Sequence, residues 1–252
     1  KDMAVFRAAL VNELEKLWKK RKALLAIVLS FAVIVFGQLL VVGIRSGWGI
    51  RGAGSLEFPI LVLSVVINTI LPLFTALLAI DCFSGEFSNN IIRFSLTRPV
   101  SRFKIYSAKV TAIALFIAVN LLLLLLLSSV AGFLFNANSA SLASYFKTIL
   151  TYLASFFPLF VLALGIILLA NTLKSGTTVF FVSILLFLLL KGMGFVLPEF
   201  ARILPTSLLD WYHLWLANTV PLAKVGRGFM LLLGYAIIFF TAGYYFFEKK
   251  EF

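Results

Sequence analysis

The sequence has few charged residues and almost none of the side chains that build metal centres. Of its 252 residues, 13% are charged, one is a cysteine and one is a histidine. Soluble domains carry about 25% charged residues, because a surface in water needs polar side chains to be solvated. The composition therefore argues against a soluble globular domain and against a disordered chain. One cysteine and one histidine also argue against a disulfide scaffold and a Cys/His metal cluster.

Sequence patterns that bind nucleotides are also missing or misplaced. The chain has no G-x-x-x-x-G-K-[ST] pattern, so it has no P-loop with which to bind ATP. Residues 47–52 spell G-x-G-x-x-G, but this pattern binds dinucleotides between a strand and a helix, and here it lies between two apolar runs. The ten acidic residues all lie in predicted loops or at span ends. Ion-coupled transport, which needs ionisable groups inside the bundle, is therefore not favoured.

Long apolar runs dominate what remains. Hydrophobic residues make up 62% of the chain, and residues 121–127 are all leucine. A barrel strand would alternate apolar and polar residues, whereas a helix of about 20 apolar residues crosses the hydrocarbon core of a bilayer. The sequence therefore predicts an all-α integral membrane protein that is a single domain over residues 1–252. Six transmembrane helices are expected at residues 23–44, 58–80, 110–135, 149–170, 177–197 and 229–247.

Lysine and arginine predict the orientation of these spans. With both termini in the cytoplasm, about twice as many basic residues lie inside as outside, in agreement with the positive-inside rule. The net charge of +12 is then explained by topology and by contact with anionic membrane lipids, and no nucleic acid is expected as a partner. We expect a multi-pass protein of the cell (plasma) membrane with cytoplasmic N- and C-termini.

Two segments outside the spans predict further helices. In residues 1–22, apolar residues recur at helical spacing from Met3 to Trp18, and Glu13 and Lys16 fall outside that stripe. This pattern predicts an amphipathic interfacial helix, which either anchors the topology or acts as a lever that moves with the first span. Residues 198–228 predict short helices on the outer face between spans five and six, as a passive plug or as an outer gate. Within them, Ser207 and Asp210 resemble a capping box.

The segment between spans two and three predicts a short helix over residues 90–96. Ser88, Asn89 or Asn90 can cap its beginning. Pro99, which lacks an N–H and restricts Arg98, ends it. Its apolar side chains would each cost about 1.5–3 kcal/mol if left in water. They must therefore be buried against lipid, against the chain itself or against a partner.

This segment resembles the permeases of the ABC type-2 exporter family. The resemblance lies in Glu86, the short apolar helix, residues 97–102 (TRPVSR) and Lys109. The layout of six spans, an N-terminal surface helix and a helical loop before the last span is similar as well. The chain departs from the family at residues 89–90, where Asn-Asn replaces a Gly-Thr-like pair.

The resemblance implies the permease subunit of an ATP-driven exporter. Two permease copies, identical or homologous, would pair, and two ABC ATPase subunits would dock below them. ATP and Mg would be bound by the ATPase, and this chain would need no cofactor and catalyse no reaction. Residues 90–96 would form the coupling helix inserted into the ATPase. The coupling residues would be Glu86, Asn90, Ile91, Ile92, Arg93, Leu96, Arg98 and Arg102. The alternative for Arg98 and Arg102 is that they anchor the loop to lipid headgroups.

Three polar residues within the predicted spans are candidates for a substrate path: Asn68, Asn120 and Lys191. The alternative for the asparagines is hydrogen bonding between helices, and for Lys191 it is snorkelling to the outer surface. Pro72 is expected to bend span two. So apolar a bundle favours a hydrophobic or amphipathic cargo, such as a peptide, an antibiotic or a lipid-like molecule. The sequence separates neither export from a toxin-immunity role nor one cargo from another.

The rival hypothesis is a membrane protein that does not transport, such as a lipid-modifying enzyme or an assembly scaffold. An enzyme would need a cluster of His, Asp or Glu at one membrane face. The sequence predicts no such cluster, so transport is favoured.

Overall fold

The computed structural model describes residues 2–48, 53–85, 101–136, 142–173, 175–197, 199, 202–217 and 219–249. All regular structure in these ranges is helical. The elements are α1 (Asp2–Lys19), α2 (Arg21–Trp48), α3 (Glu57–Asn68), α4 (Ile70–Cys82), α7 (Arg102–Phe135), α8 (Leu142–Thr172), α9 (Gly176–Val196), the 3₁₀ helix η1 (Ser207–Trp215) and α11 (Leu222–Lys249). The predicted coupling helix, residues 90–96, lies outside the described residues.

Among the described helices, α2, α7, α8, α9 and α11 are each long and apolar enough to cross a membrane, and α3 and α4 together make a sixth candidate. The prediction of an all-helical, multi-pass protein is confirmed at this level. Several helices extend past the predicted spans; α7, for example, begins at residue 102 and not at residue 110. Helical hydrogen bonds do not require apolar side chains, so a helix continues into water where an apolar run has ended.

The second predicted span is broken. α3 and α4 meet at Thr69 with a bend of 42°. Pro72, the third residue of α4, has no N–H with which to bond the carbonyl of Asn68 four residues earlier. The bend predicted from Pro72 is thereby confirmed, and Asn68 is the last residue of α3 before it.

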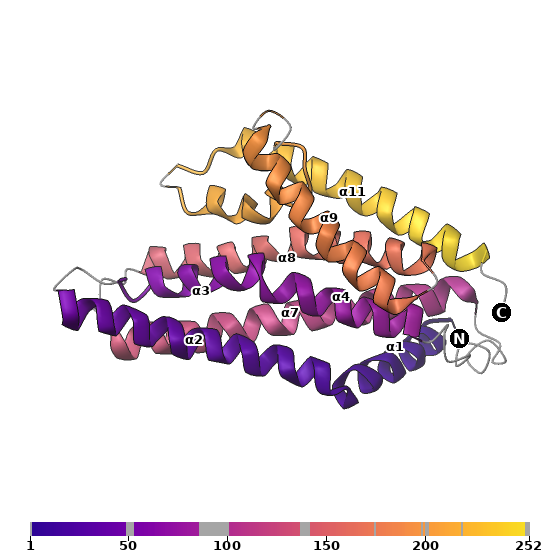
Figure 1. Cartoon of the computed structure of the whole chain (residues 1–252), viewed down its shortest axis with the longest axis horizontal. Helices are drawn as coiled ribbons and strands as arrows, with labels where there is room; N and C mark the ends of the chain where they lie inside the picture. Colours follow the sequence, from indigo (N-terminus) through magenta and orange to yellow (C-terminus); the bar gives the residue numbers. More distant parts are fainter. Residues whose placement is uncertain are drawn as a thin grey trace.

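Helix α8 runs through the middle of the bundle, with α2 and α7 on one side and α9, α11 and η1 on the other (Figure 1). At one end of the bundle, Phe83, Tyr106 and Phe247 form an aromatic cluster with ring centroids 5.5–6.0 Å apart. These rings join the residue that follows α4 to the first turns of α7 and the last turn of α11. The two ends of residues 86–100 are therefore attached to one packed unit.

At Gly132, helix α7 packs closely against Ser55, two residues before α3, and against Pro59 of α3. A Cβ added at Gly132 would collide with the backbone carbonyl of Ser55, whereas one added at Gly43 would meet no atom within 4 Å. In a helix, alanine is favoured over glycine by about 1 kcal/mol. The collision involves backbone atoms, so it cannot be relieved by a side-chain rotation.

We therefore expect Gly132→Ala to lower the thermal unfolding midpoint of the detergent-solubilised protein by several degrees. The control, Gly43→Ala, should leave the midpoint unchanged or raise it. Equal midpoints for the two variants would show that α3 and α7 do not pack as described.

Candidate functional site

Most of the predicted coupling residues lie outside the part of the chain that the structure describes: Glu86, Asn90, Ile91, Ile92, Arg93, Leu96 and Arg98. Their coupling roles stay predictions. The structure does describe both ends of this segment, the last turn of α4 and the first turns of α7. The contacts of these two ends define the candidate site.

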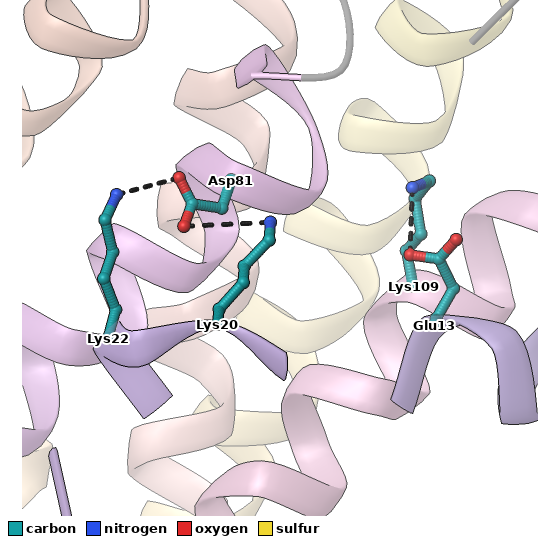
Figure 2. A network of polar contacts seen from close by, with 5 residues as sticks. All are labelled: Glu13, Lys20, Lys22, Asp81 and Lys109. Atoms are coloured by element: carbon teal, nitrogen blue, oxygen red, sulfur yellow. Dashed lines mark hydrogen bonds and ion pairs between the residues drawn. The ribbon is translucent and has the colours of Figure 1, made fainter. Parts of the chain in front are cut away.

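Asp81, in the last turn of α4, binds two lysines at the junction of α1 and α2 (Figure 2). Lys22 Nζ lies 2.9 Å from Asp81 Oδ1, and Lys20 Nζ lies 3.7 Å from Asp81 Oδ2. The Asp81 side chain is 19% exposed, so the ion pairs are partly protected from water. The end of α4 is thus tied to the point where the surface helix meets the first span.

The beginning of α7 is tied to α1 by a buried ion pair. Lys109 Nζ lies 3.1 Å from Glu13 Oε2, and Lys16 Nζ lies 2.8 Å from Glu13 Oε1. Glu13 is 5% exposed and Lys109 is 1% exposed. Lys109 also lies 5.9 Å from the centre of the Phe83 ring, within the range of a cation–π contact. Because an isolated buried charge is costly, each partner holds the other in the interior.

The position of Glu13 corrects the sequence analysis, which placed it on the polar side of the first helix. In the structure Glu13 faces the bundle, while Met3 and Trp18, from the predicted apolar stripe, are 82% and 64% exposed. The packing of α1 on α7, with Lys109 in the interior, explains the difference. Periodicity within one helix cannot reveal a charge on another helix. Contact of α1 with the membrane surface stays a prediction.

Burial and the neighbouring lysine charges shift the pKa of Glu13 in opposite directions. Burial raises the pKa of this carboxyl, but Lys109 and Lys16 together outweigh that effect and hold the pKa below its ordinary value of 4.5. The carboxylate is therefore charged at neutral pH, and the ion pair is intact there.

Arg102, the one described residue of the predicted coupling set, lies at the start of α7. Its Nη1 donates a hydrogen bond to the backbone carbonyl of Glu248 in the last turn of α11. The carbonyl end of a helix carries partial negative charge, which attracts a guanidinium. The start of α7, just after the undescribed segment, is thus joined to α11, and the contact of Arg102 with an ATPase stays a prediction.

A second polar cluster joins two of the three predicted substrate-path residues. Lys191 Nζ lies 3.1 Å from Asp210 Oδ2, and Asn68 Nδ2 donates to Asp210 Oδ1 at 3.2 Å and to the Ser64 carbonyl at 3.1 Å. The predicted capping box at Ser207 is wrong: η1 begins with no side-chain cap. Asp210 instead binds Lys191 and Asn68, because a charged amine is a stronger partner than a backbone N–H. The sequence analysis placed Asp210 only in the capping box and missed these contacts, because Asn68 lies 142 positions away along the chain.

Beside this cluster lies an apolar cavity of about 440 Å³. Most of its walls are residues of α4, α8 and α9, and Pro205, Thr206 and Phe239 also line it. Asn68 lines the cavity at the α3–α4 bend. Cavities of about 300–1,000 Å³ with apolar walls and a few polar groups are typical binding sites for small molecules.

Asn120 lies apart from this cavity. It is 1% exposed, and its Nδ2 donates to the Phe116 carbonyl of its own helix at 2.9 Å. It lines a separate space of only about 40 Å³ beside Leu17 and Trp18. The structure therefore brings together Asn68 and Lys191 but not Asn120, whose contact with substrate stays a prediction.

Among the described residues, no three His, Cys, Asp or Glu side chains are grouped so that they could hold a metal ion.

A comparison with protein families gives one match. The sequence profile described as "ABC-2 family transporter protein" matches residues 9–194, which is more than half of the chain. The chain belongs to the ABC-2 transporter family. Among curated proteins, none matches it. The matched range includes both polar clusters except Asp210, which lies beyond its end.

Family membership confirms the resemblance drawn from residues 86–109 and establishes a permease subunit of an ABC transporter. The family is one of transport permeases, and membership implies association with an ABC ATPase in general. The match therefore favours transport over a lipid-modifying enzyme or a scaffold.

We expect loss of one partner of the buried ion pair to destabilise the protein strongly. Lys109→Met leaves the Glu13 carboxylate buried with less compensation, which typically costs about 3–5 kcal/mol. The control is Lys19→Met, since Lys19 and Glu15 are exposed partners 3.9 Å apart, for which about 0–1 kcal/mol is typical. The measurement is the free energy of unfolding in detergent. Equal losses in the two variants would contradict the burial of the pair.

The lowered pKa of Glu13 predicts the pH dependence of this stabilisation. Because the folded-state pKa lies below 4.5, the contribution is fully present above that value and is lost as the pH falls through the folded-state pKa. The midpoint difference between wild type and Glu13→Gln should be large at about pH 7 and should shrink below about pH 4. A difference that stays constant over this range would show that the charge of Glu13 is not responsible.

Proposed function

We propose that this chain is the permease subunit of an ATP-driven exporter that moves a hydrophobic or amphipathic molecule out of the cytoplasm or the inner leaflet of the cell membrane. Two permease copies, identical or homologous, pair and carry two ATPase subunits, which bind ATP and Mg. Both termini lie in the cytoplasm, on the side where residues 86–100 meet the ATPase.

The observation that carries this proposal is the attachment of residues 86–100 at both ends. Asp81 joins the end before the segment to the start of α2. Lys109 and Arg102 join the end after it to α1 and α11. A force applied to the segment would therefore act on five helices: α4 and α7, which flank it, and α1, α2 and α11, which these two contact. This supports the hypothesis that α1 is a lever that moves with the first span.

Helix α4 connects the two polar clusters. It begins beside Asn68, ends at Cys82 and has 13 residues, which corresponds to about 20 Å. Asp81 lies at one end, and the cluster of Asn68, Asp210 and Lys191 lies at the other. Closure of the ATPases would push α4 along its axis, and the contact between Asn68 and Asp210 would pass the movement to η1. This connection supports η1 as an outer gate over the apolar cavity.

The test uses the permease together with the ABC ATPase that co-purifies with it, in proteoliposomes. Glu86→Ala and Arg93→Glu should reduce co-purification of the ATPase and its ATP turnover severalfold, because they remove polar contacts of the predicted coupling helix. Arg45→Glu is the control, since Arg45 lies at the far end of α2. Full docking and full turnover in both segment variants would refute the coupling role.

Asp81→Asn extends the same experiment and separates coupling from stability. It breaks partly exposed ion pairs, which contribute only about 0–1 kcal/mol each, so the protein should fold. ATPase docking should persist, while ATP-driven transport of an amphipathic fluorescent reporter should fall. Transport at the wild-type rate would show that the contact between α4 and the α1–α2 junction does not transmit force.

A further inference from the structure

A tight elbow joins the surface helix to the first span. α1 ends at Lys19 and α2 begins at Arg21. Backbone hydrogen bonds from Lys20 to the Leu17 carbonyl and from Ala23 to the Lys20 carbonyl hold the turn. Helix α7 packs against both α1 and α2. The elbow and α7 therefore form one packed corner of the bundle.

A small apolar crevice lies between these three helices. Leu17 and Trp18 line it from α1, Ala23 lines it from α2, and Leu115 and Val119 line it from α7. Its enclosed volume of about 40 Å³ is far below the volume of sites that enclose a whole small molecule, which is about 300–1,000 Å³. An occupant must therefore insert a narrow apolar part and lie mainly outside the crevice.

An exposed apolar track on α7 leads away from the crevice. Leu115, Val119, Leu122 and Leu126 follow one another at steps of four, three and four residues, which places them on one face of the helix. Their side chains are between 37% and 57% exposed. The track is about 16 Å long, close to the 15 Å or so that one leaflet contributes to the hydrocarbon core. One acyl chain therefore matches the track in length and in chemistry.

The crevice lies at one boundary of the hydrocarbon core. Phe135, the last residue of α7, lies 20 positions after Leu115, a distance of about 30 Å, which is the thickness of the core. Trp18 is 64% exposed and then lies at the level of the headgroups, where tryptophan is enriched in membrane proteins. In the orientation proposed above, this boundary is the cytoplasmic one.

Positive charge gathers at the same boundary. Residues 16–22 (KLWKKRK) hold five basic residues and no acidic one. Lys20 and Lys22 both point toward Asp81 (Figure 2), so one carboxylate faces two cations and cannot neutralise both. The elbow therefore carries a net positive charge.

Two cations of this run are exposed and lie close to the crevice. Lys19 directly follows Trp18, and Arg21 precedes Ala23 by two residues, so both lie within one helical turn of its walls. The ion pair of Lys19 with Glu15 is 3.9 Å long and exposed, and such pairs are weak. A phosphate group can therefore replace Glu15 as the partner of Lys19.

We propose that the elbow binds one anionic phospholipid as a resident partner of the permease. Lys19 and Arg21 donate hydrogen bonds to its phosphate group, one acyl chain begins in the crevice beside Trp18, and the rest of that chain lies along residues 115–126 of α7. The inference goes beyond the proposed function, because this lipid is not the cargo. It takes from that function only the cytoplasmic orientation. The lipid contacts α1, α2 and α7 at once and so stabilises the angle of the elbow.

Native mass spectrometry of the detergent-solubilised full chain tests the inference. The probe is phosphatidylglycerol with palmitoyl and oleoyl chains, and the comparison is phosphatidylcholine with the same chains, whose headgroup has no net charge. We expect the first phosphatidylglycerol to bind about tenfold more tightly than the second, and about tenfold more tightly than the first phosphatidylcholine.

A double variant tests the headgroup contacts. Each basic residue near an anionic headgroup typically contributes about fivefold in affinity, so Lys19→Gln with Arg21→Gln should bind the first phosphatidylglycerol about 30-fold more weakly. The control is Lys224→Gln with Arg227→Gln, which removes the same two kinds of side chain from exposed positions at the start of α11. The control should bind as the wild type does.

A second pair of variants tests the crevice. Val119→Phe narrows it and should weaken binding of the first phosphatidylglycerol severalfold. Val130→Phe is the control, because Val130 is an exposed residue farther along α7 that does not line the crevice, and it should leave the affinity unchanged.

Three results would overturn the inference: equal affinity for the two lipids, successive phosphatidylglycerols that bind with equal affinity, or wild-type affinity in the Lys19/Arg21 or the Val119 variant. A lipid-free dimer that Val119→Phe dissociates would overturn it as well, because a second copy of the chain would then cover the crevice. No ATPase is present, so these results are independent of the docking and turnover that test the proposed function. A lipid site that persists while Glu86→Ala and Arg93→Glu leave coupling intact would refute only the coupling role.

Discussion

The buried ion pair between Glu13 and Lys109 is the constraint on which the rest of the arrangement depends. Two charges that are almost completely withdrawn from water must stay in contact, so α1 cannot leave α7 without exposing or orphaning a charge. This pair keeps the surface helix on the bundle. With Asp81 bound to Lys20 and Lys22, it makes the two ends of residues 86–100 parts of one connected assembly.

The bend in the second span lies beside a contact between α3 and η1. Pro72 leaves the carbonyl of Asn68 without its helical partner, and the helix restarts after Thr69. The interruption places the Asn68 side chain against Asp210 of η1. Asn68, the last residue of α3, thus contacts η1, and residues of α4 form a wall of the apolar cavity.

The apolar cavity suits the hydrophobic or amphipathic cargo that we propose for this permease. Its walls are almost entirely aliphatic and aromatic. The charges of Lys191 and Asp210 compensate each other beside it.

The sequence by itself determined that the chain lies in a membrane, that its spans are helices and that the second span bends. Runs of apolar residues can cross lipid only as helices, and Pro72 lacks an N–H wherever it lies. It also contained the pattern from Glu86 to Lys109 that led to the family. Only the tertiary structure decided that Glu13 faces inward, that Asp210 binds Lys191 and Asn68, and that Asn120 lies apart. Such contacts join residues up to 142 positions apart, and the periodicity of one helix holds no information on the charges that another helix brings to it.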